Sequence, residues 1–296
     1  IIKSKLKVLL KIFIKDKQID NMIEQIRKNQ ANDHLITGLT GSARPALIHT
    51  IYQETNKSIY IMSSNLLQAQ KLVDDLTALV GDGHVHYYPA EEFIAANMTT
   101  SSHELRAQRI ATLGRLVNQE RGIYIIPVAG MRSMLNAPQK WLGYELSTSL
   151  GQDVDINTWL DKLVEMGYTR SEMVTTPGEF AMRGGILDIY PPYAQDPIRI
   201  ELFDTEVDSI RTFSSDNQRS IEKLKEIKIF PATELLLTKE ERIKLAERLE
   251  ASLAVSLKKV RKQETQELLM QNIQHDIELL RLGHLPDHIA KYGSLL

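Results

Sequence analysis

The chain has 296 residues, a length typical of about two domains, and its 43% hydrophobic and 25% charged content excludes wholesale disorder. The net charge of −2 gives no global attraction to a polyanion, so any nucleic-acid contact must be local. The chain has no cysteine, which excludes disulfides, thiolate catalysis and zinc–cysteine sites and predicts a cytoplasmic protein.

Residues 1–30 are predicted to form an amino-terminal helical extension. Six lysines interrupt its apolar residues between Lys3 and Lys17, so no apolar run approaches the ~20 residues of a membrane span. The segment also lacks the compact apolar block and the cleavage site of a signal peptide. We expect the helix to pack on its own domain, while a basic amphipathic helix on a membrane surface remains the alternative.

Residues 31–135 alternate short apolar runs with helical periodicity. The apolar runs predict strands at 34–39, 57–64, 84–89 and 122–128. The helical pattern predicts helices at 44–54, 65–80 and 103–117. Asn65 is placed to cap the second helix. Strands that alternate with helices predict an α/β domain with a parallel, doubly wound sheet.

Residues 136–232 are predicted to form a smaller, β-rich α+β domain. After a helix at 156–166, period-two apolar runs are separated by Gly, Pro and Asp turns, and "FDTEVDSI" predicts a hairpin with acidic residues at its tip.

In residues 233–296, Thr238 and Glu241 form a capping-box signature. A long helical stretch to about Leu282 is predicted to follow.

The stretch "TGLTGSARPAL" lies between a predicted strand and a predicted helix, as a phosphate-binding loop does. Such a loop is written G-x-x-x-x-G-K-[ST]. Here the frame contains Gly38, Gly41, Ala43, Arg44 and Pro45. Pro45 has neither the hydroxyl that would bind Mg²⁺ nor an N–H to face an anion, and Arg44 lacks the compact charge of lysine. The loop is therefore predicted to be degenerate.

No apolar strand of the chain ends in the acidic pair that a nucleotide-bound metal needs. We therefore expect no catalytic residue, no metal and no cofactor in this chain. The alternative is an active P-loop ATPase or helicase fragment. His84 and His86 lie on one strand face, but no partner is spaced for a metal site, so they are expected to be structural.

One long ordered string, "GYTRSEMVTTPGEFAMRGGILDIYPPYAQDPIRIELFDTEVDSIRTFSSDNQRS", spans Gly167–Ser220. It resembles the domain that the excision-repair protein UvrB shares with bacterial transcription-repair coupling factors. The degenerate loop and the short segment "FIAANMTTSSHE", which has no room for UvrB's aromatic hairpin, favour the coupling factors. The resemblance implies their amino-terminal, UvrB-homology module.

The resemblance also implies an architecture. Residues 31–135 would be a degenerate RecA-like domain similar to UvrB domain 1a. Residues 136–232 would be an inserted UvrA-binding domain similar to UvrB domain 2. Residues 233–296 would be a truncated helical segment that returns to the first domain.

By resemblance, the second domain recruits UvrA through an exposed face. The residues that the family pattern assigns to this contact are Arg170, Arg183, Phe180 and Glu179. Ala181 departs from the pattern, since UvrB carries an arginine there, which predicts a weaker face. The full-length family protein uses ATP and Mg²⁺ in a motor absent here, and it binds RNA polymerase and duplex DNA through absent regions. An intramolecular contact with the missing carboxyl-terminal part is implied as well, and no membrane contact.

The residues themselves support part of this assignment. Strand alternation places Glu179, Ala181 and Arg183 on one side of the strand and Phe180 and Met182 on the other. If Phe180 and Met182 face the core, Arg183 stands in solvent.

Two alternatives to this assignment remain open. In the first alternative, Arg170 and Arg183 only pair with Glu172, Glu179 or Asp188 inside the domain, and Phe180 belongs to the core. A second kind of function is direct DNA binding, for which the basic stretch 256–264 is the candidate, although it also reads as a solvated helix face.

Overall fold

The computed structural model describes residues 16–30, 33–81, 83–90, 103–132, 135–286 and 289–295. It divides into two units. Unit 1 contains residues 1–92 and 118–132, and unit 2 contains residues 93–117 and 133–296. Residues 1–15 of the predicted amino-terminal helical extension and most of the segment "FIAANMTTSSHE" lie outside the described residues. Within the described ranges, no helix is both long enough and apolar enough to cross a bilayer.

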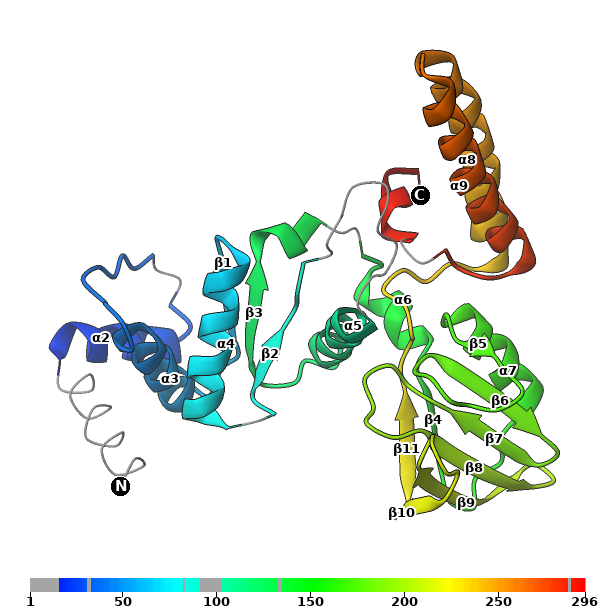
Figure 1. Ribbon diagram of the computed structural model, residues 1–296. Coiled ribbons are helices and arrows are strands. Elements are labelled where there is room, and N and C mark those ends of the chain that lie inside the picture. The colour runs from blue at the N-terminus through cyan, green and yellow to red at the C-terminus, as the bar shows by residue number, and fades with distance from the viewer. Residues whose placement is uncertain are drawn as a thin grey trace. The chain divides into compact units, whose positions relative to one another are not determined.

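Unit 1 is a mixed α/β unit with a three-stranded parallel sheet (Figure 1). Its described elements are α2 (Lys17–Arg27), α3 (Ala43–Thr55), β1 (Ile59–Ser63), α4 (Leu66–Val80), β2 (Val85–Tyr87), β3 (Ile123–Pro127) and the 3₁₀ helix η1 (Val128–Arg132). The strand order β1-β3-β2 confirms the predicted parallel sheet. The side chain of Asn65 accepts a hydrogen bond from the Gln68 N–H at 2.8 Å, so the predicted cap of α4 is also confirmed.

The predicted strand at residues 34–39 is not formed. These residues have no regular secondary structure, and Leu35 is 92% exposed. An apolar run becomes a strand only when a neighbouring strand supplies its hydrogen bonds. In the described part of the chain, the sheet β1-β3-β2 contains no strand that pairs with these residues.

Unit 2 carries two antiparallel arrangements and several helices. Its strands are β4 (Leu146–Ser149), β5 (Thr169–Arg170), β6 (Glu179–Arg183), β7 (Ile186–Ile189), β8 (Ile198–Phe203), β9 (Glu206–Phe213), β10 (Ser220–Leu224) and β11 (Glu226–Ile229). They form a six-stranded sheet, β10-β9-β8-β7-β6-β5, and a two-stranded sheet, β11-β4. Among the described strands of unit 2, only β5 pairs in parallel, with β6. The strand-rich character predicted from the turn residues is confirmed.

The helices of unit 2 are α5 (His103–Val117), α6 (Pro138–Gly143), α7 (Ile156–Glu165), α8 (Lys239–Lys259), α9 (Gln263–Leu282) and the 3₁₀ helix η2 (Ile289–Leu295). Helix α7 packs its apolar face on the six-stranded sheet, where Trp159, Leu163 and Met166 meet Phe180 in one core. Helix α5 is tied into unit 2 by Arg109, which forms a buried ion pair with Glu234.

The hairpin predicted at "FDTEVDSI" joins β8 to β9. Phe203 pairs with Glu206, so the turn consists of Asp204 and Thr205 alone, and Asp204 has a positive φ of 58°. Two-residue hairpin turns need this left-handed conformation, which Asp tolerates better than most residues. The turn residue therefore sets the pairing of the two longest strands next to the turn, and a shift between Glu201 and Leu202 changes their register farther along.

The predicted capping box at the start of α8 is present. The Thr238 side chain accepts from the Glu241 N–H at 3.2 Å, and the Glu241 carboxylate accepts from the Thr238 N–H at 2.9 Å. The long helical stretch to Leu282 is interrupted at residues 260–262, where Val260 adopts an extended conformation. Helices α8 and α9 then lie side by side as a hairpin (Figure 1). Leu245 and Leu249 pack against Ile277 and Leu280 in a second core.

Candidate partner-binding face

The turn between β6 and β7 fixes where the strand bearing Arg183 ends. Arg183 pairs with Ile186, so the turn consists of Gly184 and Gly185. Gly184 has a φ of +59°, which favours glycine. At Gly185, a Cβ atom would lie 2.6 Å from the carbonyl oxygen of Leu202. Both glycines are therefore required by the backbone, and Arg183 is held at the last position of β6.

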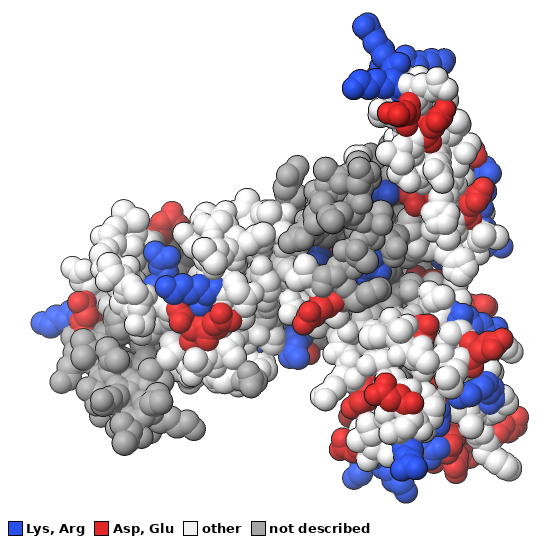
Figure 2. Space-filling view, viewed as in Figure 1, with Lys and Arg blue, Asp and Glu red and all other residues white. Residues whose placement is uncertain are grey.

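The six-stranded sheet has an apolar face and a charged face. Phe180, Leu187 and Ile200 point into the core with α7. The opposite face carries a row of in-register residues, one from each of five strands: Ala181, Asp188, Arg199, Arg211 and Lys223. Figure 2 shows side chains of both charges over this strand-rich part of unit 2. The alternation predicted for β6 is therefore confirmed.

Asp188 is the centre of this charged face. Its side chain is only 1% exposed, yet it is ionically paired on two sides. Arg199 donates from Nε to Oδ1 at 2.6 Å and from Nη2 to Oδ2 at 2.8 Å, the fork geometry that guanidinium makes with carboxylate. Arg183 donates from Nη2 to Oδ2 at 3.0 Å. A buried carboxylate thus organises two arginines.

Arg199 is itself fixed from several directions. It donates to the Gln218 side-chain oxygen at 3.0 Å, and its guanidinium lies 4.3 Å from the centroid of the Phe213 ring. The hydrogen bonds with Asp188 outweigh the effect of burial and raise the pKa of Arg199 above its usual value. Arg199 therefore balances the charge of Asp188 within the domain.

Arg183 keeps half of its side chain in solvent. The side chain is 49% exposed, whereas that of Arg199 is 12% exposed. Since Arg199 already neutralises the single negative charge of Asp188, the group of three carries a net charge of +1, and Arg183 presents it. The ion pair with Asp188 was the alternative to an exposed arginine. The structure contains both features: the Arg183 side chain is paired with Asp188, and half of it is exposed to solvent.

Two of the other three predicted contact residues, Arg170 and Phe180, do not share the face of Arg183. Arg170 is exposed, but it is in register with Phe180 and therefore belongs to the sheet face opposite Arg183. Phe180 is 0% exposed and packs in the core, not on the surface. The structure thus does not bring Arg170, Phe180 and Arg183 onto one surface.

Glu179 has a local structural role. Its carboxylate accepts hydrogen bonds from the backbone N–H groups of Thr175 and Thr176, each at 2.9 Å. Partial burial opposes ionisation, but these hydrogen bonds prevail and lower the pKa of Glu179 below its usual value. Glu179 fixes the turn that leads into β6.

Sequence reasoning missed Arg199, Arg211 and Gln218 as members of this charged face. Arg211 pairs with Glu201, and Gln218 also donates to the Val174 carbonyl at 3.3 Å. The available signal was the alternation in "IRIELF" and "EVDSIRTF", which places Arg199 and Arg211 opposite the apolar positions. Their alignment with Asp188 depends on strand register, which alternation alone does not give.

The degenerate loop lies at the start of α3 in unit 1. Gly38 and Gly41 have φ values of +80° and +54°, Ala43 opens the helix, Arg44 is exposed and Pro45 is buried in its first turn. A cavity of about 230 Å³ adjoins the loop, and it is lined by Leu39, Gly41, Arg44, Pro45, Gln68, Lys71, Leu72 and Asp75. The predicted loop-to-helix transition is present. Pro45 offers no hydroxyl for Mg²⁺, so these residues do not fit a bound metal–nucleotide pair.

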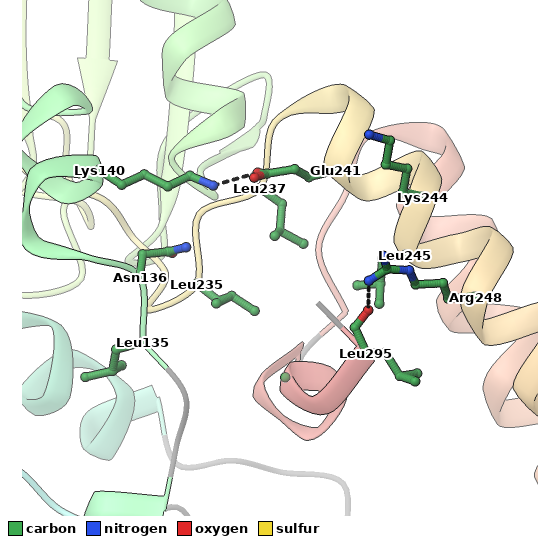
Figure 3. A pocket seen from close by; sticks show the side chains of 11 residues that line it. Leu135, Asn136, Lys140, Leu235, Leu237, Glu241, Lys244, Leu245, Arg248 and Leu295 are labelled. Carbon is green, nitrogen blue, oxygen red and sulfur yellow. Dashed lines mark hydrogen bonds and ion pairs between the residues drawn. The ribbon is translucent and has the colours of Figure 1, made fainter.

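A second cavity, of about 330 Å³, lies within unit 2 between the start of α8 and η2 (Figure 3). Leucines 135, 235, 237, 245 and 295 form much of its wall. Lys140 pairs with Glu241 at 2.6 Å, and Arg248 donates to the Leu295 carbonyl. These polar groups are engaged with one another, so they do not converge on a ligand.

Comparison with known proteins identifies the part of the chain that carries the charged face. Residues 146–235 match the family described as the UvrB interaction domain. The transcription-repair-coupling factor of Bacillus subtilis (strain 168) is 45% identical over 289 residues, which cover 96% of this chain and 24% of that protein. The same factor of Staphylococcus aureus (strain MRSA252) is 38% identical over 223 residues, which cover 75% of this chain and 19% of that protein.

The chain thus spans about a quarter or less of the length of these relatives. The match to Bacillus subtilis nevertheless covers almost all of the chain, including both units. The charged face of β6–β9 lies inside the matched UvrB interaction domain. The chain therefore belongs to the transcription-repair-coupling factor family, of which it is the part that contains the UvrB interaction domain.

Proposed function

We propose that this chain recruits the repair protein UvrA and has no catalytic role of its own. The observation that carries the proposal is the half-exposed guanidinium of Arg183, which Asp188 holds on a face of the UvrB interaction domain. A guanidinium binds a carboxylate through two parallel N–H···O bonds. An acidic surface of UvrA is therefore the partner chemistry that this face fits, and recruitment would link a stalled polymerase to excision repair.

Replacing Arg183 by alanine is expected to weaken UvrA binding by roughly 1–3 kcal/mol, or about 5- to 150-fold, as for an arginine at the centre of an interface. Titration calorimetry with purified UvrA measures the change. The matched control is Arg281→Ala, since Arg281 is likewise exposed (55%) and paired with a carboxylate, but lies on α9. Equal affinities of the Arg183 variant and the wild type would contradict the proposal.

A second variant locates the edge of the surface. Because Arg170 is on the opposite sheet face, Arg170→Glu is expected to weaken binding less than Arg183→Ala. A larger effect at Arg170 would move the proposed contact from the charged face to that edge.

For unit 1, we propose a degenerate RecA-like domain that serves as scaffold. The β-rich domain follows it in the chain, since residues 133–296 all belong to unit 2. The loop-to-helix geometry at residues 38–45 and the parallel sheet support this assignment. Pro45 lacks both the N–H and the hydroxyl that a phosphate loop uses, which supports the absence of nucleotide hydrolysis. The rival function is a UvrB-type P-loop ATPase.

Equilibrium binding of labelled ATP in the presence of Mg²⁺ separates these two functions. The chain is expected to show no micromolar affinity, because the loop offers neither the metal-binding hydroxyl nor the lysine. The matched variant is Ala43→Gly, Arg44→Lys, Pro45→Thr, which restores the loop pattern. Micromolar affinity of the unaltered chain would revive the ATPase function.

For the whole family protein, we propose ATP-driven translocation on duplex DNA that displaces RNA polymerase, with ATP and Mg²⁺ bound outside this chain. The relatives' name, transcription-repair-coupling factor, supports that role. We further propose that the module contacts the carboxyl-terminal part of the protein and works in the cytoplasm.

A further inference from the structure

The tip of the α8–α9 hairpin carries a dense group of cations. Four of its five residues from position 258 to position 262 are charged, and all four are exposed: Lys258, Lys259, Arg261 and Lys262. Figure 2 shows them as the group of blue side chains at the free end of the hairpin. We define these four residues as the cationic tip.

The cationic tip differs from most of the cations described above in unit 2, because its residues are not paired with carboxylates in the described chain. The cations that pair with a carboxylate there include Arg109, Lys140, Arg183, Arg199, Arg211, Lys228, Arg281 and Lys291. Within the described part of the chain, no ion pair involves any of the four tip residues. Their charges are therefore available to a partner.

The turn that bears the tip is held in one conformation. The side-chain amide of Gln266 donates to the carbonyl oxygens of Leu257 at 3.1 Å and Val260 at 2.7 Å. The Val260 N–H donates to the Ser256 carbonyl at 3.2 Å. Because the end of α8 and the start of α9 are joined in this way, a partner would meet the cations already gathered.

Local helix stability accounts for two of these residues, because Lys258 and Lys259 lie in the last turn of α8, where the helix dipole favours cations. It does not account for Arg261 and Lys262. Lys262 occupies the N-cap position of α9 and makes no side-chain capping bond, whereas Asp16, Asn65, Asp155 and Thr238 cap other helices. Arg261 and Lys262 lie at the positive end of the α9 dipole, where cations are unfavourable. Four like charges also repel one another. Residues that oppose their local structure in this way are typical of functional sites.

The distal half of the hairpin is unburied. No side chain between residues 250 and 275 is classed as buried, while the proximal parts of α8 and α9 supply Leu245, Leu249, Ile277 and Leu280 to the core. The stretch 250–275 contains no Phe, Tyr or Trp. It has no aromatic surface on which unpaired bases could stack.

We propose that the cationic tip docks on the phosphate backbone of duplex DNA without reading its sequence. Three of the four cations are lysines, which act as point charges toward phosphate, whereas planar recognition of carboxylates favours arginine. The absence of aromatic residues favours a duplex over a single strand. This site is separate from the charged face of the six-stranded sheet and adds a nucleic-acid contact to the proposed partner-recruiting role.

The test is fluorescence anisotropy of the 296-residue chain with a labelled 20-base-pair duplex of mixed sequence at several salt concentrations. With four phosphate contacts, log K is expected to fall against log[salt] with a slope of about −3.6, which is roughly 100-fold between 50 and 200 mM salt. The variant K258Q/K259Q/R261Q/K262Q is expected to lose at least tenfold in affinity and most of this slope. The single variant K259Q should reduce the slope by about 1.

A matched control removes four other exposed cations of unit 2, again three lysines and one arginine, in the variant R219Q/K225Q/K239Q/K244Q. It has the same net charge as the tip variant, and it is expected to keep the wild-type slope. Equal losses in the two variants, or no duplex binding by the wild type, would overturn the proposal. Displacement of the duplex by polyglutamate at matched ionic strength would assign the tip to an acidic protein instead. Thermal melts of the variants verify that folding is unchanged.

Discussion

Replacing Arg109 by alanine is expected to lower the free energy of unfolding by about 3–5 kcal/mol, because it leaves a buried carboxylate without its guanidinium. Arg109 on α5 is 1% exposed and Glu234 is 8% exposed. The guanidinium holds Glu234 through two bonds, of which Nη2 to Oε2 measures 2.6 Å. The backbone carbonyl of Glu234 also accepts from the Trp141 indole at 3.3 Å, so the loss would loosen a junction of three segments.

Urea denaturation followed by circular dichroism measures this change. The control is Lys140→Ala, because Lys140 also pairs with a glutamate, at 2.6 Å, but both side chains are partly exposed, at 26% and 43%. Such a pair contributes at most about 1 kcal/mol. The double variant Arg109→Met, Glu234→Leu should recover much of the loss, since neither of these two positions then holds a buried charge. A loss at Arg109 no larger than at Lys140 would contradict the role of the ion pair.

Features of the fold that depend on neighbouring residues were predictable from the sequence. Asn65 and Thr238 cap their helices as expected, because a cap needs only a side-chain oxygen and the next turn of backbone. The Asp204 turn also follows from local chemistry, since Asp tolerates positive φ. Helix α5 begins and ends at the residues that its pattern predicted.

Features that depend on distant partners were not predictable. Residues 34–39 have the composition of a strand but no strand beside them in the described chain. The interruption of the long helical stretch at Val260 follows from α9 folding back on α8, where the leucines of both helices share a core. The buried pair of Arg109 and Glu234 joins residues 125 positions apart, and no local pattern marks it.

The candidate site also combines features that the sequence predicted with features that depend on distant partners. Alternation along β6 correctly placed Arg183 on the polar side and Phe180 on the apolar side. The opposite placement of Arg170 depends on its parallel register with Phe180, and the coupling of Asp188 to Arg199 depends on the register of β7 and β8. Register is set by pairing between strands, which the period-two pattern leaves undetermined.

Replacing Phe180 by alanine is expected to lower the free energy of unfolding by about 3–5 kcal/mol, because the ring fills the core beneath the charged face. Phe180 is 0% exposed and shares its cluster with Leu163, Met166 and Ile189. Phe180→Leu should cost less, since it leaves a smaller cavity. Urea denaturation of both variants measures the effect.

The same variants separate a core residue from a contact residue. If Phe180 supports the face only through packing, Phe180→Ala should bind UvrA with an affinity close to that of the wild type under conditions where it is still folded. Arg183→Ala should show the reverse pattern, with weakened binding and nearly unchanged stability, because half of its side chain is in solvent. A Phe180→Ala variant that stays fully stable but loses UvrA would mean that the ring leaves the core to meet the partner, and the binding surface would then lie on the other side of the sheet.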